Sequence, residues 1–292
     1  MTQSTIYISL VLLGLVLGSF AGALVWRLRS RQLSEDKEDG IEVNDAEYKR
    51  LHPLSKTSLL EDYSRCLSCS HRLRWYDMVP IISWIALRGR CRRCHTRIGW
   101  LEPLTEISLA VFFVSSYAFW PYPLESTLEI ARLIIWLIAG TGLLVLFIYD
   151  LKWLLLPDKV NFVVIGLGII NASIVIFMAQ DILSALMNIG VAVLILSGLY
   201  LMLNLSSRGK WVGLGDVKLG LGLALLLADW RLAFVAFFAA NLVGTLAVIP
   251  AMITGKVKRD SHIPLGPLLI AGWVIAGLAG QYLIDTYLFA LV

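Results

Sequence analysis

The chain has 292 residues, of which 58% are hydrophobic and 16% charged, and its formal net charge is +4. A soluble domain averages about 45–50% apolar and about 25% charged residues, and the mean hydropathy here is +0.76. These values exclude a disordered chain, a collagen, a coiled coil and an ordinary cytosolic enzyme, and they predict an all-α protein that crosses a membrane several times.

The first apolar run covers residues 5–27 and is long enough to span a bilayer, which takes about 20 helical residues. No Lys or Arg precedes it, whereas Arg27, Arg29 and Arg31 follow it. A secretory signal peptide instead carries its positive charge before a shorter apolar run. We therefore predict an uncleaved anchor over residues 1–27, with its N-terminus outside and its C-terminal end in the cytoplasm.

A cytoplasmic loop is predicted over residues 28–102. Its part from 31 to 64 is polar and of mixed charge, which is typical of a flexible tether with room for one short helix. Two Cys-x-x-Cys pairs follow, with 21 residues between them: Cys66 with Cys69, and Cys91 with Cys94. This spacing is close to that of a four-thiolate zinc ribbon, in which each knuckle turns two sulfurs toward one tetrahedral ion.

Disulfides rarely persist in the reducing cytoplasm, so we predict a small zinc-ribbon-like domain with a structural zinc site; free thiols and a redox pair are the alternatives. His71 and His95 follow the two pairs, but four cysteines already close the coordination shell, so both are interpreted as surface histidines. The nearby arginines indicate cytoplasmic placement and contact with anionic lipid, and no nucleic-acid partner is expected. They are Arg88, Arg90, Arg92, Arg93 and Arg97.

Seven further apolar runs bring the prediction to about eight transmembrane helices, with a transmembrane core over residues 103–292. They lie near residues 103–120, 130–149, 160–179, 182–204, 215–229, 232–254 and 264–284. Counting the run at residues 5–27 as the first, the sixth run, near 215–229, is short and rich in glycine. We therefore expect it to be tilted or only partly embedded in the membrane. Eight crossings place both termini outside.

The distribution of Lys and Arg agrees with this orientation. Of the 25 such residues, 15 lie within residues 27–97, and eight more lie at three short loop ends predicted to be cytoplasmic. Only Arg132 and Arg231 are left outside, as the positive-inside rule requires.

Ionisable side chains at membrane depth are costly and are candidates for function. Asp150 ends the third apolar run and Asp216 begins the sixth, both at predicted cytoplasmic ends, while Glu106 lies just inside the second. Two carboxylates that share a site cannot both ionise cheaply, so one can activate a water while the other donates a proton. Spacing alone leaves open a paired-aspartate site, a proton relay in a transporter, and roles in packing.

Asp158 is a weaker candidate. It follows Pro157 and precedes an apolar run, which is typical of a helix start with Asp158 as the N-cap or as an acid of the first turn. A share in catalysis is the alternative.

Several short motifs, in order along residues 14–272, together resemble those of the type IV prepilin leader peptidases. They are residues 14–20 with Arg27, the double Cys-x-x-Cys with residues 83–84 and 87–91, residues 103–106, Asp150 with residues 156–158, residues 213–219, and residues 263–267. The resemblance implies an aspartyl intramembrane endopeptidase of the bacterial inner membrane. It would remove the basic leader of type IV prepilins or pseudopilins at the cytoplasmic face, with Asp150 and Asp216 as its catalytic residues.

Many members of that family also methylate the new N-terminus from S-adenosylmethionine, and the resemblance links Pro80 and Glu106 to the methylating half without identifying residues that bind the cofactor. Here residues 77–80 read DMVP where the family has DNIP, and residues 100–106 read WLEPLTE without the family's Arg-Tyr. Both departures lie away from the two aspartates in sequence, so they bear on methylation rather than on cleavage.

Two competing hypotheses remain at this point. Tyr149-Asp150 and residues 213–216 also resemble the YD and GxGD motifs of presenilin-like proteases, although a cytoplasmic double Cys-x-x-Cys is foreign to them and no PAL triplet follows Asp216. A polytopic transporter with Asp150 and Asp216 as its proton relay is the alternative from another class. Leader cleavage without an ion gradient would favour the peptidase, and flux without any peptide substrate would favour the transporter.

Overall fold

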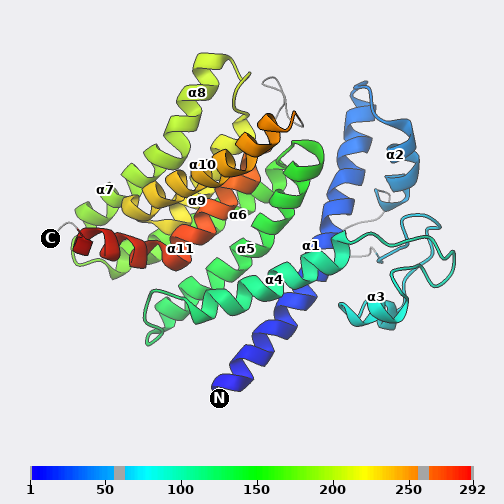
Figure 1. Ribbon diagram of the computed structural model, residues 1–292, viewed down its shortest axis with the longest axis horizontal. Helices are drawn as coiled ribbons and strands as arrows, with labels where there is room; N and C mark the ends of the chain where they lie inside the picture. The colour runs from blue at the N-terminus through cyan, green and yellow to red at the C-terminus, as the bar shows by residue number, and fades with distance from the viewer. Residues whose placement is uncertain (1, 56–62, 256–262, 291–292) are drawn as a thin grey trace. The chain divides into compact units, whose positions relative to one another are not determined.

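The computed structural model describes residues 2–55, 63–255 and 263–290 (Figure 1). Within these ranges the chain is helical, with two isolated β-bridges and no strand, which confirms the predicted all-α class. The chain divides into two compact units, Met1–Val114 and Ser115–Val292. The predicted cytoplasmic loop end that holds Lys256, Lys258 and Arg259 lies outside the described residues.

The first unit combines two long helices with several short elements. They are α1 (Gln3–Glu38), α2 (Asp45–Leu51), the 3-10 turns η1 (His52–Leu54) and η2 (Trp75–Asp77), α3 (Ile82–Ala86), and α4 (Leu101–Ala118), which continues into the second unit. Two glycines of α1 allow α4 to approach closely. A Cβ at Gly14 would lie 2.5 Å from the Cα of Ala110, and one at Gly18 would lie 2.5 Å from the Cα of Glu106.

Helix α1 extends beyond the predicted end of the first span, and α2 folds back against it (Figure 1). Leu33 on α1 forms a buried cluster with Leu51 and Leu54, and the Ser30 hydroxyl donates a hydrogen bond to the Leu51 carbonyl (2.7 Å). The short helix was predicted, but the interpretation as a flexible tether was wrong over residues 31–54. The buried leucines explain why, because they hold the polar helix in place.

The second unit is a helical bundle. Its elements are α5 (Thr127–Trp153), α6 (Asp158–Met178), α7 (Ile182–Val193), the π-helical turn η3 (Leu194–Gly198), α8 (Leu199–Ser207), α9 (Leu214–Leu227), α10 (Trp230–Ile253) and α11 (Leu265–Ala290). Helices α10 and α11 lie side by side (Figure 1), and Trp136 of α5 stacks on Trp273 of α11 with ring centroids 3.6 Å apart. Close packing of α6 on α9 depends on Gly168 and Gly222, since a Cβ at either would lie within 3 Å of the facing side chain.

Six helices among the described residues are long and apolar enough to cross a membrane, which confirms a multi-pass membrane protein. They are α1, α5, α6, the continuous helix from α7 through η3 to α8, α10 and α11. The other two predicted spans are helical but are not among these six: α4 has 18 residues, or about 27 Å at 1.5 Å per residue, and contains two glutamates, and α9 has 14 residues. At 1.5 Å per residue, α9 reaches about 21 Å, less than the ~30 Å hydrocarbon core.

Candidate active site and metal centre

Asp150 lies in the last turn of α5, where its side chain is buried. Its Oδ2 accepts a hydrogen bond of 2.9 Å from the backbone N–H of Gly266, in the first turn of α11. The N-terminus of a helix carries a partial positive charge, which favours an anion there. A Cβ at Gly266 would lie 2.9 Å from the same oxygen, so this approach depends on glycine.

Asp216 lies in the first turn of α9, again at a helix N-terminus, and is partly buried. Its Oδ2 accepts a hydrogen bond of 3.2 Å from the N–H of Gly213, the N-cap residue of α9. The carboxyl groups of Asp150 and Asp216 are close enough to repel each other electrostatically. The structure therefore brings the two predicted catalytic carboxylates to the same end of the second unit.

Leu156 lies between the segment that carries Asp216 and the first turn of α11, whose Gly266 binds Asp150. A Cβ at Gly215, next to Asp216, would lie 3.0 Å from the Leu156 Cβ, and one at Gly266 would lie 3.3 Å from its Cδ2. From the sequence alone, Leu156 has no role beyond its place in a motif. Its contacts depend on two segments that follow it by 59 and 110 positions in the chain, so spacing gave no signal for them.

Helix α6 contacts the first turns of α9 through two polar side chains. Both carboxylate oxygens of Asp158 accept hydrogen bonds from the Lys218 Nζ (2.7 and 2.8 Å). The fully buried Asn161 donates from its Nδ2 to the Gly215 carbonyl (3.4 Å). Asp158 is a first-turn acid, as one prediction held, whereas the N-cap position belongs to Pro157. The N-cap alternative for Asp158 was wrong, because α6 begins at Asp158 itself.

The π-helical turn η3 contacts α9 from another direction. The Ser197 hydroxyl donates to the carbonyl of Val217 (2.9 Å), and Gly220 lies directly against the carbonyl of Leu196. The buried side chain of Tyr200, one helical turn beyond Ser197, interacts electrostatically with Asp216. Sequence reasoning missed Ser197 and Tyr200, because polar side chains of this size are common in spanning helices.

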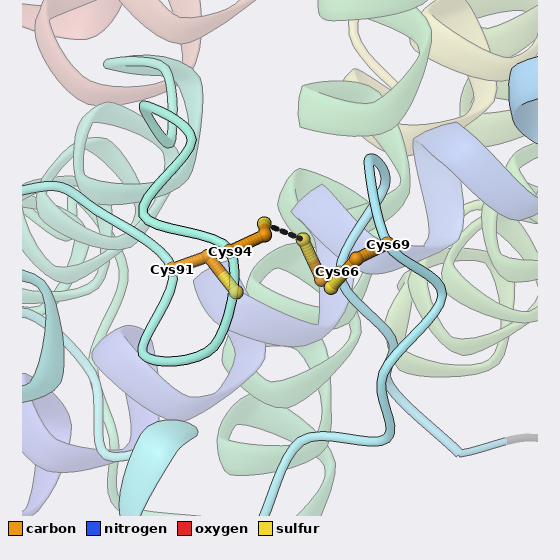
Figure 2. Close-up of side chains that lie close together, drawn as sticks. All are labelled: Cys66, Cys69, Cys91 and Cys94. Carbon is orange, nitrogen blue, oxygen red and sulfur yellow. Dashed lines mark hydrogen bonds between the residues drawn. The ribbon is translucent and has the colours of Figure 1, made fainter.

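The four cysteines of the first unit point toward one another from two loops (Figure 2). Their sulfur atoms all lie within 4.8 Å of one another, and the Sγ atoms of Cys66 and Cys94 are 3.8 Å apart. Zinc–sulfur bonds of about 2.3 Å in a tetrahedral site place neighbouring sulfurs about 3.8 Å apart. Cys66, Cys69, Cys91 and Cys94 therefore fit a four-thiolate zinc site.

The two cysteine loops repeat the same turn. Cys66 donates its N–H to the His71 carbonyl and Cys91 donates to that of Thr96, and Ser70 and His95 occupy equivalent positions with φ of 55° and 56°. Antiparallel bridges join Arg65 with Arg72 and Arg90 with Arg97. Within the described residues no histidine belongs to the metal-binding group, so the interpretation of His71 and His95 as non-ligands agrees with the geometry.

The cysteine thiols differ in acidity. Burial raises the pKa of the Cys66 thiol to about 12, whereas hydrogen bonds from Thr96 lower the pKa of Cys94 to about 6. A coordinating zinc ion deprotonates thiols outright, because its charge stabilises the thiolates. Metal binding would thus offset the cost of forming a thiolate at the partly buried Cys66.

Glu106 is buried in the first unit, where α4 packs on α1. Its Oε2 accepts a hydrogen bond of 2.7 Å from the N–H of Ile81, the residue after Pro80. The carboxylate also interacts with the Ser19 side chain and is repelled by Glu102. Glu106 therefore attaches the loop that precedes α3 to helix α4.

Comparisons with known proteins cover most of the chain. Residues 12–120 match the bacterial peptidase A24 N-terminal domain, and residues 137–249 match the type IV leader peptidase family. The prepilin leader peptidase/N-methyltransferase of Stutzerimonas stutzeri is 30% identical over 285 residues, which covers 95% of this chain and 92% of that protein. The protein of the same name from Pseudomonas aeruginosa is 30% identical, with 95% and 92% covered. No solved structure gave a significant match.

Proposed function

This chain belongs to the type IV leader peptidase family, and we propose that it is an aspartyl endopeptidase that cuts the basic leader from type IV prepilins or pseudopilins. The observation that carries the aspartyl mechanism is the approach of Asp150 and Asp216 at one end of the second unit, each beside a helix N-terminus. The resemblance of the motifs to the family assigns these same two residues.

The proposed chemistry needs only the two carboxylates and a water molecule. One aspartate takes a proton from the water as it attacks the scissile carbonyl, while the other, protonated, donates to the carbonyl oxygen or to the leaving nitrogen. Repulsion between the two groups favours the shared proton that this division of roles requires. The two carboxylates titrate as a pair, so the roles belong to the pair rather than to either residue.

The substrate class agrees with the position of the pair at helix ends. A prepilin offers a short basic leader followed by an apolar helix, so its scissile bond lies where water meets lipid. Asp150 ends a spanning helix, which suits a bond at that depth. We infer that the apolar segment supplies most of the binding, on the cytoplasmic side of a bacterial inner membrane. This orientation requires α4 and α9 to cross the membrane with the six longer helices, α9 at a place where the bilayer thins, so that both termini of the enzyme lie outside.

Zinc would be structural in this proposal. Four cysteines close a tetrahedral shell and leave no open position for water or substrate, so Cys66, Cys69, Cys91 and Cys94 would hold the ion while Asp150 and Asp216 do the chemistry. The names of the relatives also support N-methylation of the new N-terminus. S-adenosylmethionine would supply the methyl group when bound.

The test is cleavage of a purified prepilin by the wild-type enzyme and its Asp150→Asn and Asp216→Asn variants. Asn keeps the size of the side chain but removes the acid, so turnover should fall at least ~10²-fold, the low end for general acid–base catalysis. Asp158→Asn is the matched control, and its turnover should stay within a few-fold of wild type. Intact mass of the product shows whether a methyl group was added.

Two outcomes would overturn parts of the proposal. Loss of cleavage in Asp158→Asn together with normal cleavage in Asp150→Asn would mean that the first catalytic aspartate is Asp158. Absence of cleavage by wild type in vesicles, with proton-coupled flux that depends on Asp150 and Asp216, would favour the transporter. Family membership argues for the peptidase.

A further inference from the structure

Helix α4 has one face buried and one exposed within the first unit. The exposed apolar side chains of Leu104, Ile107 and Val111 form a single stripe, since they recur every three or four residues. Trp100, which is 67% exposed, lies one turn before Leu104 on the same stripe. An exposed apolar stripe of this kind is suited to contact with the hydrocarbon core of a bilayer.

The stripe meets a second apolar surface at its N-terminal end. The rings of Trp100 and Trp84 lie 4.5 Å apart, and Trp84 belongs to α3. Glu106 holds the residue before α3 through the N–H of Ile81, so two contacts fix α3 against the start of α4. Helix α3 leaves Ile82 and Ile85 exposed by 67% and 62%, on the same side of one helical turn.

The segment that carries this surface is strongly basic, and its five arginines between α3 and α4 are all exposed: Arg88, Arg90, Arg92, Arg93 and Arg97. Residues 63–100 contain eight arginines and one acid, Asp77, and Asp77 is already paired with Arg92 (2.8 Å). Two more large side chains are exposed just before α3: Trp75 begins η2 and Met78 directly follows it. Aromatic and aliphatic side chains beside arginines are the composition of segments that lie in the headgroup layer of a bilayer.

We propose that the face formed by Ile82, Ile85 and Trp100, with the arginines around it, docks on the bilayer surface and recognises anionic lipid headgroups. The continuity with the exposed apolar stripe of α4 argues for a membrane, and the charge argues for anionic lipid. A basic prepilin leader would be repelled by the same arginines, and a nucleic acid would leave the aliphatic side chains uncovered. Docking would keep the cysteine loops at the membrane surface where, on the proposed function, the new N-terminus emerges.

The test replaces Ile85 with a photo-crosslinking phenylalanine derivative in the full-length protein, reconstituted in vesicles that contain phosphatidylglycerol. Ile41 is the matched control, because it is the same residue type, 58% exposed, and follows the polar end of α1. After illumination, we expect several-fold more phospholipid adduct at position 85 than at position 41. Adducts of position 85 with a second copy or with a prepilin, or equal lipid yields at both positions, would overturn the docking.

Two further measurements complete the experiment. Replacing phosphatidylglycerol with phosphatidylcholine should lower the lipid adduct at position 85 several-fold, as should Arg88→Gln combined with Arg97→Gln; an unchanged yield would overturn the recognition of anionic lipid. A second probe at Ile82 guards against local misfolding at position 85. If neither probe yields lipid adduct while the loop resists limited proteolysis as in wild type, the proposal is wrong.

Discussion

In the proposed active site, a larger side chain should be most damaging at Gly266. Its N–H donates to Asp150, and a Cβ there would lie 2.9 Å from the accepting oxygen and 3.3 Å from Leu156. Gly266→Ala should therefore displace the carboxylate and lower the cleavage rate by about 10²-fold, the cost of a misplacement of about 1 Å.

The matched control for Gly266 is Gly190→Ala, because no atom lies within 4 Å of the added Cβ in helix α7. In a helix interior Ala is favoured over Gly by about 1 kcal/mol, so this variant should retain cleavage and melt no lower than wild type. Cleavage rates and thermal unfolding in detergent measure both effects. Equal activity of the two variants would contradict the assigned hydrogen bond.

Leu156 should act as a positioning residue for the aspartate pair. Because its side chain touches the positions of Gly215 and Gly266, Leu156→Ala loosens both backbone segments at once, and we expect at least a ~10-fold loss of turnover from misplaced carboxylates. Leu155→Ala is the control, since Leu155 is exposed. A positioning role predicts a fall in kcat with little change in KM, whereas a loss confined to KM would indicate a substrate contact instead.

At the scale of elements, α6 and α9 are joined by the ion pair of Asp158 and Lys218. The pair is partly exposed, and such pairs contribute about 0–1 kcal/mol, so Lys218→Met should lower the free energy of unfolding by less than ~1 kcal/mol and keep most activity. Exchanging the two charges, Asp158→Lys with Lys218→Asp, should restore any lost stability. Denaturant unfolding measures this free energy. A decrease of several kcal/mol in Lys218→Met would contradict the interpretation of the pair as screened by solvent.

The sequence predicted the existence of the long helices better than their ends and contacts. Apolar runs predicted α5, α6, α10 and α11 because a spanning helix must bury its whole length in lipid. The polar end of α1 was missed, since its stability comes from packing of Leu33 on Leu51 and Leu54 rather than from hydropathy. The π-helical turn η3 was also missed; it packs closely on Gly220 of α9, a contact that hydropathy does not indicate.

The candidate site shows a similar limit. Asp150 and Asp216 could be chosen from the sequence because carboxylates are rare at membrane depth. Their hydrogen-bond donors could not all be chosen: Gly213 is local to Asp216, but Gly266 follows Asp150 by 116 positions. The cysteine cluster was predictable because a repeated short motif carries its own geometry.

At the scale of the whole molecule, the cysteine cluster and the aspartate pair belong to different compact units. The closed thiolate shell gives zinc no chemical role in cleavage. Stability that comes from the metal should therefore be confined to the first unit, whereas peptide cleavage should depend on the second. Because of this separation, a variant can lose zinc and still cleave its substrate.

Cys66→Ser tests that separation. It should lower the zinc content of the purified protein well below one ion per chain and make the loops around residues 63–100 sensitive to protease, because binding energy of a structural zinc is folding energy. Cleavage of a prepilin should fall by less than ~10-fold, far less than the ~10² expected of an aspartate variant.

Ser68→Ala, at the exposed position between Cys66 and Cys69, should leave zinc content, protease resistance and cleavage unchanged. Normal protease resistance without zinc would mean that the cysteine loops fold without metal, and cleavage that vanishes with zinc would mean that the second unit depends on the first.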